Sequence, residues 1–172
     1  AGCRRSRKST SGGTIMLGSH LIRSYSKTQS VIAKSSGESE LYAAVRASAE
    51  GLGMITLLGD FGCQNAKVRV GMDASAAIGM AQRTGLNKVR HVEVDVLWIQ
   101  EQVARRMLPI TKIPGPRNPS DLCTKNVSVA LMEQYMEHTN SYQRRLGSSV
   151  REDHNTARGV GFDLEYINIY QR

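Results

Sequence analysis

The longest periodic stretch in the sequence sets the strongest limit on the fold. Beyond Leu41, apolar and small residues recur mostly at steps of three and four, which is the spacing of an amphipathic helix. Ser35 and Glu38 have the S-x-x-E spacing of a capping box, which satisfies backbone amides at a helix start. Gly62 suits the left-handed position that follows a helix. The sequence therefore predicts a helix over about residues 36–60, with one face buried.

Shorter patterns on both sides of this helix predict an α/β fold. Two β-prone runs flank Gly18, Ser19 and His20, an arrangement typical of a β-hairpin. A strand, a helix and a strand in succession imply parallel neighbours joined by a right-handed crossover. The other elements that we expect are strands near 68–72 and 108–113, and helices near 74–83, 89–106 and 120–136.

The character of the chain changes beyond about residue 138. Residues 141–161 are polar and rich in Arg, Asn and Ser, without apolar periodicity, and residues 162–170 alternate in hydrophobicity without an evident partner strand. We therefore assign residues 1–137 to one domain. Residues 138–172 form a basic, polar tail whose composition and terminal position allow disorder.

Three acidic residues stand at the ends of three predicted elements. Glu40 lies near the start of the long helix, at the edge of its buried face, Asp73 follows a strand, and Asp121 begins a late helix. Mg²⁺ takes oxygen ligands and keeps several waters, so a few carboxylates suffice to hold it. The pattern predicts a divalent-metal site, although the helix dipole alone also explains an acid in a first turn.

The net charge of +8 and the sequence pI of about 9.7 favour a polyanionic partner. Aromatic residues make up only 5% of the chain, which counts against a base-stacking surface and favours contact with backbone phosphate. Solvated basic turns remain the alternative interpretation. The residues that we expect to contact nucleic acid are Arg7, Lys8, Ser9, Thr10, Lys88, Arg90 and His91.

Cysteine usage and hydropathy bear on the compartment. Cys3, Cys63 and Cys123 are far apart and form no C-x-x-C or Cys/His cluster, so neither a disulfide framework nor a zinc site is indicated. No run approaches the roughly 20 apolar residues of a membrane span. Reduced thiols in an intracellular compartment are the simplest interpretation of these cysteines. The chain opens on Ala1-Gly2 without a secretory signal or an initiator Met, which suggests a fragment or a domain excised from a longer protein.

Five short motifs occur in the order and register of one known family. They are RKSTSG at 7–12, SSGESELY at 35–42, DASAA at 73–77, KVRHV at 88–92 and NPSDLCTK at 118–125. Over about residues 1–127, the chain resembles the ribonuclease H domain of copia-type LTR retrotransposon polyproteins. The resemblance implies a ribonuclease H-like fold, with a mixed sheet of about five strands flanked by helices.

The resemblance also implies a chemistry, a substrate and a setting. Two Mg²⁺ or Mn²⁺ ions would support hydrolysis of the RNA strand in an RNA–DNA hybrid. Groove shape and the RNA 2′-hydroxyls, rather than base sequence, would identify the hybrid. Glu40, Asp73 and Asp121 match the catalytic, metal-binding acids of the family. The domain would adjoin the upstream reverse transcriptase region in an intracellular setting, either a cytoplasmic particle or the nucleus, without a membrane.

The chain departs from the family pattern in two places. The first catalytic aspartate of the family belongs to a D-x-D-W stretch that would precede Ala1-Gly2, so we expect an N-terminally truncated domain. Its first, central strand and one metal ligand should be missing, and this fragment alone should be inactive. Asp95 also stands where the family usually has a basic residue.

These departures keep other functions open. A non-catalytic retroelement remnant that at most binds nucleic acid is the main alternative. An integrase-like relative would have its glutamate last in the sequence, whereas Glu40 precedes both Asp73 and Asp121.

Overall fold

The computed structural model describes residues 3–85, 93–141 and 166–171. Its elements alternate between strands and helices, as the sequence predicts, and two short 3₁₀ helices (η2 and η3) precede the last α-helix. In chain order they are β1 (Thr10–Leu17), β2 (His20–Thr28), α1 (Ser36–Asp60), β3 (Lys67–Met72), α2 (Ser75–Gln82), α3 (Glu93–Ala104), β4 (Ile110–Lys112), η2 (Gly115–Arg117), η3 (Pro119–Cys123), α4 (Val129–His138) and β5 (Tyr166–Gln171).

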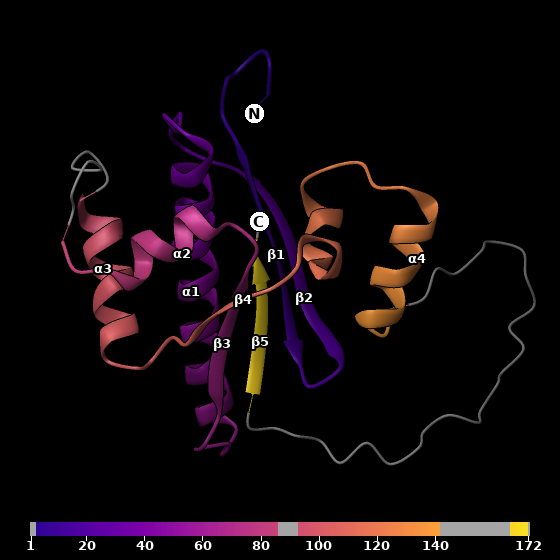
Figure 1. The fold of residues 1–172 in the computed structure, drawn as a ribbon. Coiled ribbons are helices and arrows are strands. Elements are labelled where there is room, and N and C mark those ends of the chain that lie inside the picture. The colour runs from indigo at the N-terminus through magenta and orange to yellow at the C-terminus, as the bar shows by residue number, and fades with distance from the viewer. Residues whose placement is uncertain (1–2, 86–92, 142–165, 172) are drawn as a thin grey trace, which may run out of the picture.

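The five strands form one mixed sheet in the order β2-β1-β5-β3-β4. β1 pairs with β2 and with β5 in antiparallel fashion, whereas β3 pairs with β5 and with β4 in parallel. Helices α1, α2 and α3 lie on one side of this sheet, and η3 and α4 lie on the other (Figure 1). This confirms the predicted α/β class, a mixed five-stranded sheet flanked by helices, which is consistent with a ribonuclease H-like fold.

The central position of the sheet is filled by β5, at the C-terminal end of the chain (Figure 1). From the sequence, residues 166–171 are assigned to the tail 138–172, and that assignment needs correction for these six residues. The strand expected to precede Ala1-Gly2 is not among the described elements, and β5 takes the central position expected for it. Ile167 and Ile169 are fully buried, and β5 pairs along both edges. Their alternation is visible in the sequence, but the two partner strands are far away in the chain. Residues 142–165 of the predicted tail lie outside the described residues.

Helix α1 spans the predicted residues because both of its ends carry local signals. Ser35 Oγ accepts a hydrogen bond from the Glu38 amide at 3.1 Å, while the Glu38 carboxylate accepts from the Lys34 amide at 3.0 Å. The reciprocal bond of the capping box therefore reaches one residue further back than expected. At the other end, Gly62 has a φ of +88° and the Cys63 amide donates to the Leu58 carbonyl at 2.9 Å. That is the Schellman arrangement.

The helix predicted over 120–136 is divided in the structure. Asn118 Oδ1 accepts from the Ser120 amide and so caps η3, whereas Ser128 Oγ accepts from the Leu131 amide and caps α4. Each capping side chain begins a separate helix. The break matters for the site, because it keeps Asp121 in the short η3 segment against the sheet rather than on a long helix.

The core lies between α1 and the sheet. Its fully buried members include Ile15, Leu41, Val70 and Ile169. Helix α1 approaches the sheet closely at Gly51, where an added Cβ would lie 2.3 Å from Ile169 Cδ1. In the part of the chain that the structure describes, no helix has the length and apolar composition needed to cross a membrane.

Candidate functional site at the acidic end of the sheet

Strand pairing brings distant parts of the chain to one end of the sheet. Gln171 of β5 pairs with Gly13 of β1 and with Met72 of β3. The first half of β1 and the carboxyl end of β3 therefore lie level with each other. Asp73 directly follows Met72, so this end of the sheet carries the predicted acid of β3.

The start of α1 is held beside this end of the sheet. Gln29, just after β2, donates through Nε2 to Ser11 Oγ in β1 at 3.0 Å and to the Ser39 carbonyl in α1 at 2.8 Å. Glu40 is the next residue of α1; its side chain is half-buried and its Oε2 atom is buried. The structure thus places Glu40 where the sequence predicts it, at the margin between the helix and the sheet.

Asp73 and Asp121 both lie near Gly115, the first residue of η2. A Cβ added at Gly115 would lie 3.8 Å from Asp73 Oδ2. The Tyr135 hydroxyl lies 3.2 Å from the Gly115 carbonyl and 3.4 Å from Asp121 Oδ2, and it can donate to either oxygen. The two aspartates, 48 positions apart in the sequence, are therefore gathered around the loop that follows β4.

The predicted metal site is incomplete in the described residues. Asp121 is almost fully buried and pairs with Lys125 Nζ at 2.6 Å, so its negative charge is already matched. Within residues 3–85, 93–141 and 166–171, no three His, Cys, Asp or Glu side chains form a group suited to a metal ion. The acids of this part of the chain do not by themselves fit a metal cluster, and their roles as ligands stay predictions.

Four of the residues predicted to bind nucleic acid lie on the approach to β1. Arg7 is exposed in the preceding loop, Lys8 and Ser9 are half-buried, and Thr10 is exposed at the first position of the strand. The Gln29 amide donates to the Ser9 carbonyl at 2.8 Å, which fixes this loop beside the end of β2. Lys88, Arg90 and His91 lie outside the described residues.

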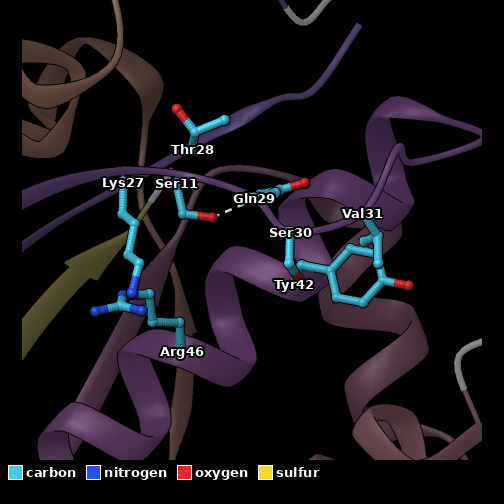
Figure 2. A pocket seen from close by; sticks show the side chains of 8 residues that line it. All are labelled: Ser11, Lys27, Thr28, Gln29, Ser30, Val31, Tyr42 and Arg46. Atoms are coloured by element: carbon cyan, nitrogen blue, oxygen red, sulfur yellow. Dashed lines mark hydrogen bonds between the residues drawn. The ribbon is translucent and has the colours of Figure 1, made fainter. Parts of the chain in front are cut away.

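A polar cleft adjoins the acidic end and was not predicted from the sequence. It opens between β2, the residues that follow it, and α1, and its wall includes Ser11, Lys27, Thr28, Gln29, Tyr42 and Arg46 (Figure 2). Lys27 and Arg46 come from different elements, so no local pattern joins them. The one sequence pattern that could have indicated this cleft is the alternation of Arg23, Tyr25 and Lys27, which places these three side chains on one face of β2.

Two tyrosines beside this cleft have altered acidities. Burial raises the pKa of Tyr25 to about 12, with the neighbouring Arg46 charge opposing part of the effect. Burial also raises the pKa of Tyr42, and the carboxylates of Glu38 and Asp95 add to it. Asp95 of α3 therefore lies near Tyr42, in the first turns of α1.

Comparison with known proteins shows similarity to a transposon polyprotein. No family model matches the sequence, and no solved structure matches it significantly. The chain is 30% identical over 122 residues to the retrovirus-related Pol polyprotein from transposon TNT 1-94 of Nicotiana tabacum. The match covers 70% of this chain and spans only 9% of the relative. The chain is therefore related to a segment of a transposon Pol polyprotein.

Proposed function

We propose that this chain is the ribonuclease H domain of a copia-like retroelement polyprotein, which hydrolyses the RNA strand of RNA–DNA hybrids. The observation that carries the proposal is that Asp73 and Asp121 lie near the same residue, Gly115, at one end of a mixed sheet. Asp73 approaches Gly115 directly, and Asp121 is linked to it through the Tyr135 hydroxyl. Glu40 lies in the first turns of α1, which are held beside the same end of the sheet. The relationship to a transposon Pol polyprotein supports the same assignment.

Each acid has a distinct proposed role. Asp73, at the carboxyl end of β3, and Glu40, at the start of α1, would bind the metal ions, and Asp121 would assist from η3. Bound Mg²⁺ or Mn²⁺ would supply an activated water and stabilise the leaving oxygen. Because the described acids do not form a metal cluster by themselves, we propose that a further carboxylate comes from the reverse transcriptase side of the polyprotein.

Charge supports a nucleic-acid partner for this end of the sheet. The chain carries 23 Lys and Arg residues against 15 Asp and Glu residues. Arg7 and Lys8 precede β1 at the same end as Asp73, so backbone phosphates of a hybrid would meet positive charge beside the acids. Such contacts would position the hybrid without reading its base sequence.

A specific observation favours a second candidate function, a non-catalytic remnant that only binds nucleic acid. The Lys125 ammonium lies 2.6 Å from Asp121 Oδ2 and occupies one side of the carboxylate that would have to face a cation. In a protein that retains this pairing, Asp121 would stay engaged by Lys125 instead of assisting a metal ion, while the basic surface would still bind phosphate.

The deciding experiment compares two proteins on a labelled RNA–DNA hybrid with Mg²⁺ or Mn²⁺. One is this chain, and the other adds about 20 residues that precede it in the polyprotein, enough for one strand and its turn. The added strand would have to take the central position between β1 and β3 that β5 fills in this structure. We expect cleavage by the longer protein only. In that protein, Glu40→Gln and Asp73→Asn should abolish cleavage, whereas Asp60→Asn, at the exposed C-terminal end of α1, should not.

The opposite results would decide against the assignment. If the longer protein is folded, binds the hybrid and still does not cut it, the remnant is the better description. If Asp73→Asn cuts as fast as Asp60→Asn, the proposed catalytic roles are wrong.

A further inference from the structure

We propose that the cleft between β2 and α1 is a binding site for a backbone phosphate of a nucleic acid. The cavity has a volume of about 230 Å³. Its wall carries two cationic side chains, Lys27 and Arg46, together with hydroxyl groups of residues 11, 28 and 30 (Figure 2). Cations and hydroxyl donors are the side chains with which proteins usually contact phosphate.

The cationic groups at this cleft are only partly neutralised. Glu50 pairs with Arg46 at 3.1 Å and with Arg23 at 2.7 Å, so one carboxylate serves two guanidinium groups. Lys27 forms no ion pair with any residue that the structure describes. The described residues that line the cleft include two cations, Lys27 and Arg46, and no carboxylate. Glu50 pairs with Arg46, and the carboxylates of Glu38 and Asp95 act on Tyr42 at the other wall. We therefore expect an anion to bind on the Lys27 and Arg46 side of the cleft.

The orientation of Arg46 is fixed before any ligand binds. Its guanidinium carbon lies 5.1 Å from the centre of the Tyr25 ring, and Nη2 donates to Glu50. Its Nε atom is buried and has no hydrogen-bond partner among the described residues. A buried donor without a partner is unusual in folded proteins. The Arg46 side chain is 33% exposed, so an anion in the cleft would bond to the accessible part of the guanidinium rather than to Nε.

Gln29 connects the two walls of the cleft by hydrogen bonds. Its Nε2 group donates to Ser11 Oγ of β1 and to the Ser39 carbonyl of α1, so it links the strand wall of the cleft to the helix wall. The same residue is bonded through its backbone to Ser9, in the basic loop that precedes β1. The cleft therefore lies beside the loop that carries the predicted nucleic-acid contacts Arg7 and Lys8.

This inference rests on the proposed function, which brings a nucleic-acid strand to the acidic end of the sheet. Ser39 contacts Gln29 and is the neighbour of Glu40, so the cleft adjoins the first turns of α1. A strand that passes the acids would continue over this cleft, and one of its phosphates would lie between Lys27 and Arg46.

The test measures the salt dependence of binding with the full chain and its Lys27→Ala variant. The probes are a labelled RNA–DNA hybrid and a DNA duplex, without divalent cations, so that no cleavage occurs. Lys67→Ala is the matched control, because Lys67 is exposed at the first position of β3, the end of that strand remote from Asp73. We expect Lys27→Ala to weaken binding severalfold and to reduce the slope of log K against log salt by about 0.9. The control should leave the slope unchanged.

Each outcome decides between the two proposals. Equal slopes for Lys27→Ala and Lys67→Ala would overturn the phosphate site while leaving the proposed function standing. If Lys27→Ala weakens binding to both probes and the extended protein cuts no hybrid, the phosphate site stands and the nuclease assignment falls. If the unaltered chain binds neither probe, the phosphate site falls, and cleavage by the extended protein alone decides the nuclease assignment.

Discussion

Tyr25 shows how one side chain connects the sheet to the cleft. Its ring lies over Gly13 of the neighbouring strand, where an added Cβ would come within 2.4 Å of the ring. The guanidinium carbon of Arg46 lies 5.1 Å from the centre of the same ring. Its hydroxyl is buried without a hydrogen-bond partner among the described residues. Gly13 is therefore required at this position because only a residue without a Cβ leaves room for the ring.

The raised pKa of Tyr25 makes stability depend on pH in the alkaline range. The unfolded phenol ionises near pH 10 and the folded one near 12, so the folded state favours the protonated form. The stabilisation is complete below pH 10 and is lost as the pH rises to about 12, an effect of about 3 kcal/mol. Urea unfolding at pH 9 and at pH 11.5 should show this loss, and Tyr25→Phe should reduce it. A parallel loss of stability in both proteins would contradict the assignment.

At the scale of the element, α1 owes its position to small residues on its buried face. Gly51 faces Ile169 and Val68, and Ala44 and Ala47 are fully buried on the same helix. These residues let the helix backbone lie close to the central strand. Gly53, two positions further on, has no atom within 4 Å of an added Cβ.

The two glycines predict opposite effects of the same substitution. Gly53→Ala should stabilise the protein by about 0.5–1 kcal/mol, because alanine lowers the entropic cost of forming the helix. Gly51→Ala should destabilise it by about 1–3 kcal/mol, because its Cβ would lie 2.3 Å from Ile169 Cδ1 and overpack the core. Chemical denaturation of both variants measures the difference. A stabilising Gly51→Ala would mean that α1 lies further from β5 than the structure shows.

Elements whose ends carry local capping residues are predicted well from the sequence, whereas contacts between distant elements are not. Both ends of α1 follow from local capping residues, Ser35 and Gly62, so its bounds are correctly predicted. The segment over 120–136 is predicted less well, because Ser128 begins a second helix within it and divides one apparent helix in two. The acids at the element ends are predictable, whereas the cleft is not. Lys27 and Arg46 become neighbours only when β2 packs beside α1.

At the scale of the whole molecule, β5 joins two parts of the sheet that are otherwise not paired to each other. β1 and β2 form one antiparallel pair, β3 and β4 form one parallel pair, and β5 hydrogen-bonds to both β1 and β3. Ile167 and Ile169 are completely buried from this position. The strands that pair with β5, namely β1 and β3, lie about 100 or more residues earlier in the chain. No pattern near residues 166–171 therefore indicates a strand partner, and both residues are assigned to the tail from the sequence.

Charge introduced at β5 should therefore disrupt the entire domain. Ile169→Asp places an unpaired carboxylate in the core and should destabilise the protein by more than about 4 kcal/mol. Val129→Asp is the control, because Val129 is 67% exposed at the start of α4. Thermal unfolding followed by circular dichroism should remain cooperative in the control and be lost in Ile169→Asp. A cooperative transition in both variants would show that β5 is dispensable.

The position of β5 also determines when the protein can fold during its synthesis. Translation produces the two outer pairs of strands first, and each then exposes an unpaired inner edge until residues 166–171 have been made. Unpaired strand edges in a nascent chain invite association with other chains. Joining distant segments also makes folding slow, because the entropy of closing long loops must be overcome before the contacts form. A ribosome stalled before residue 166 should therefore hold a chain that is sensitive to protease, and protection should appear only once the last strand has emerged.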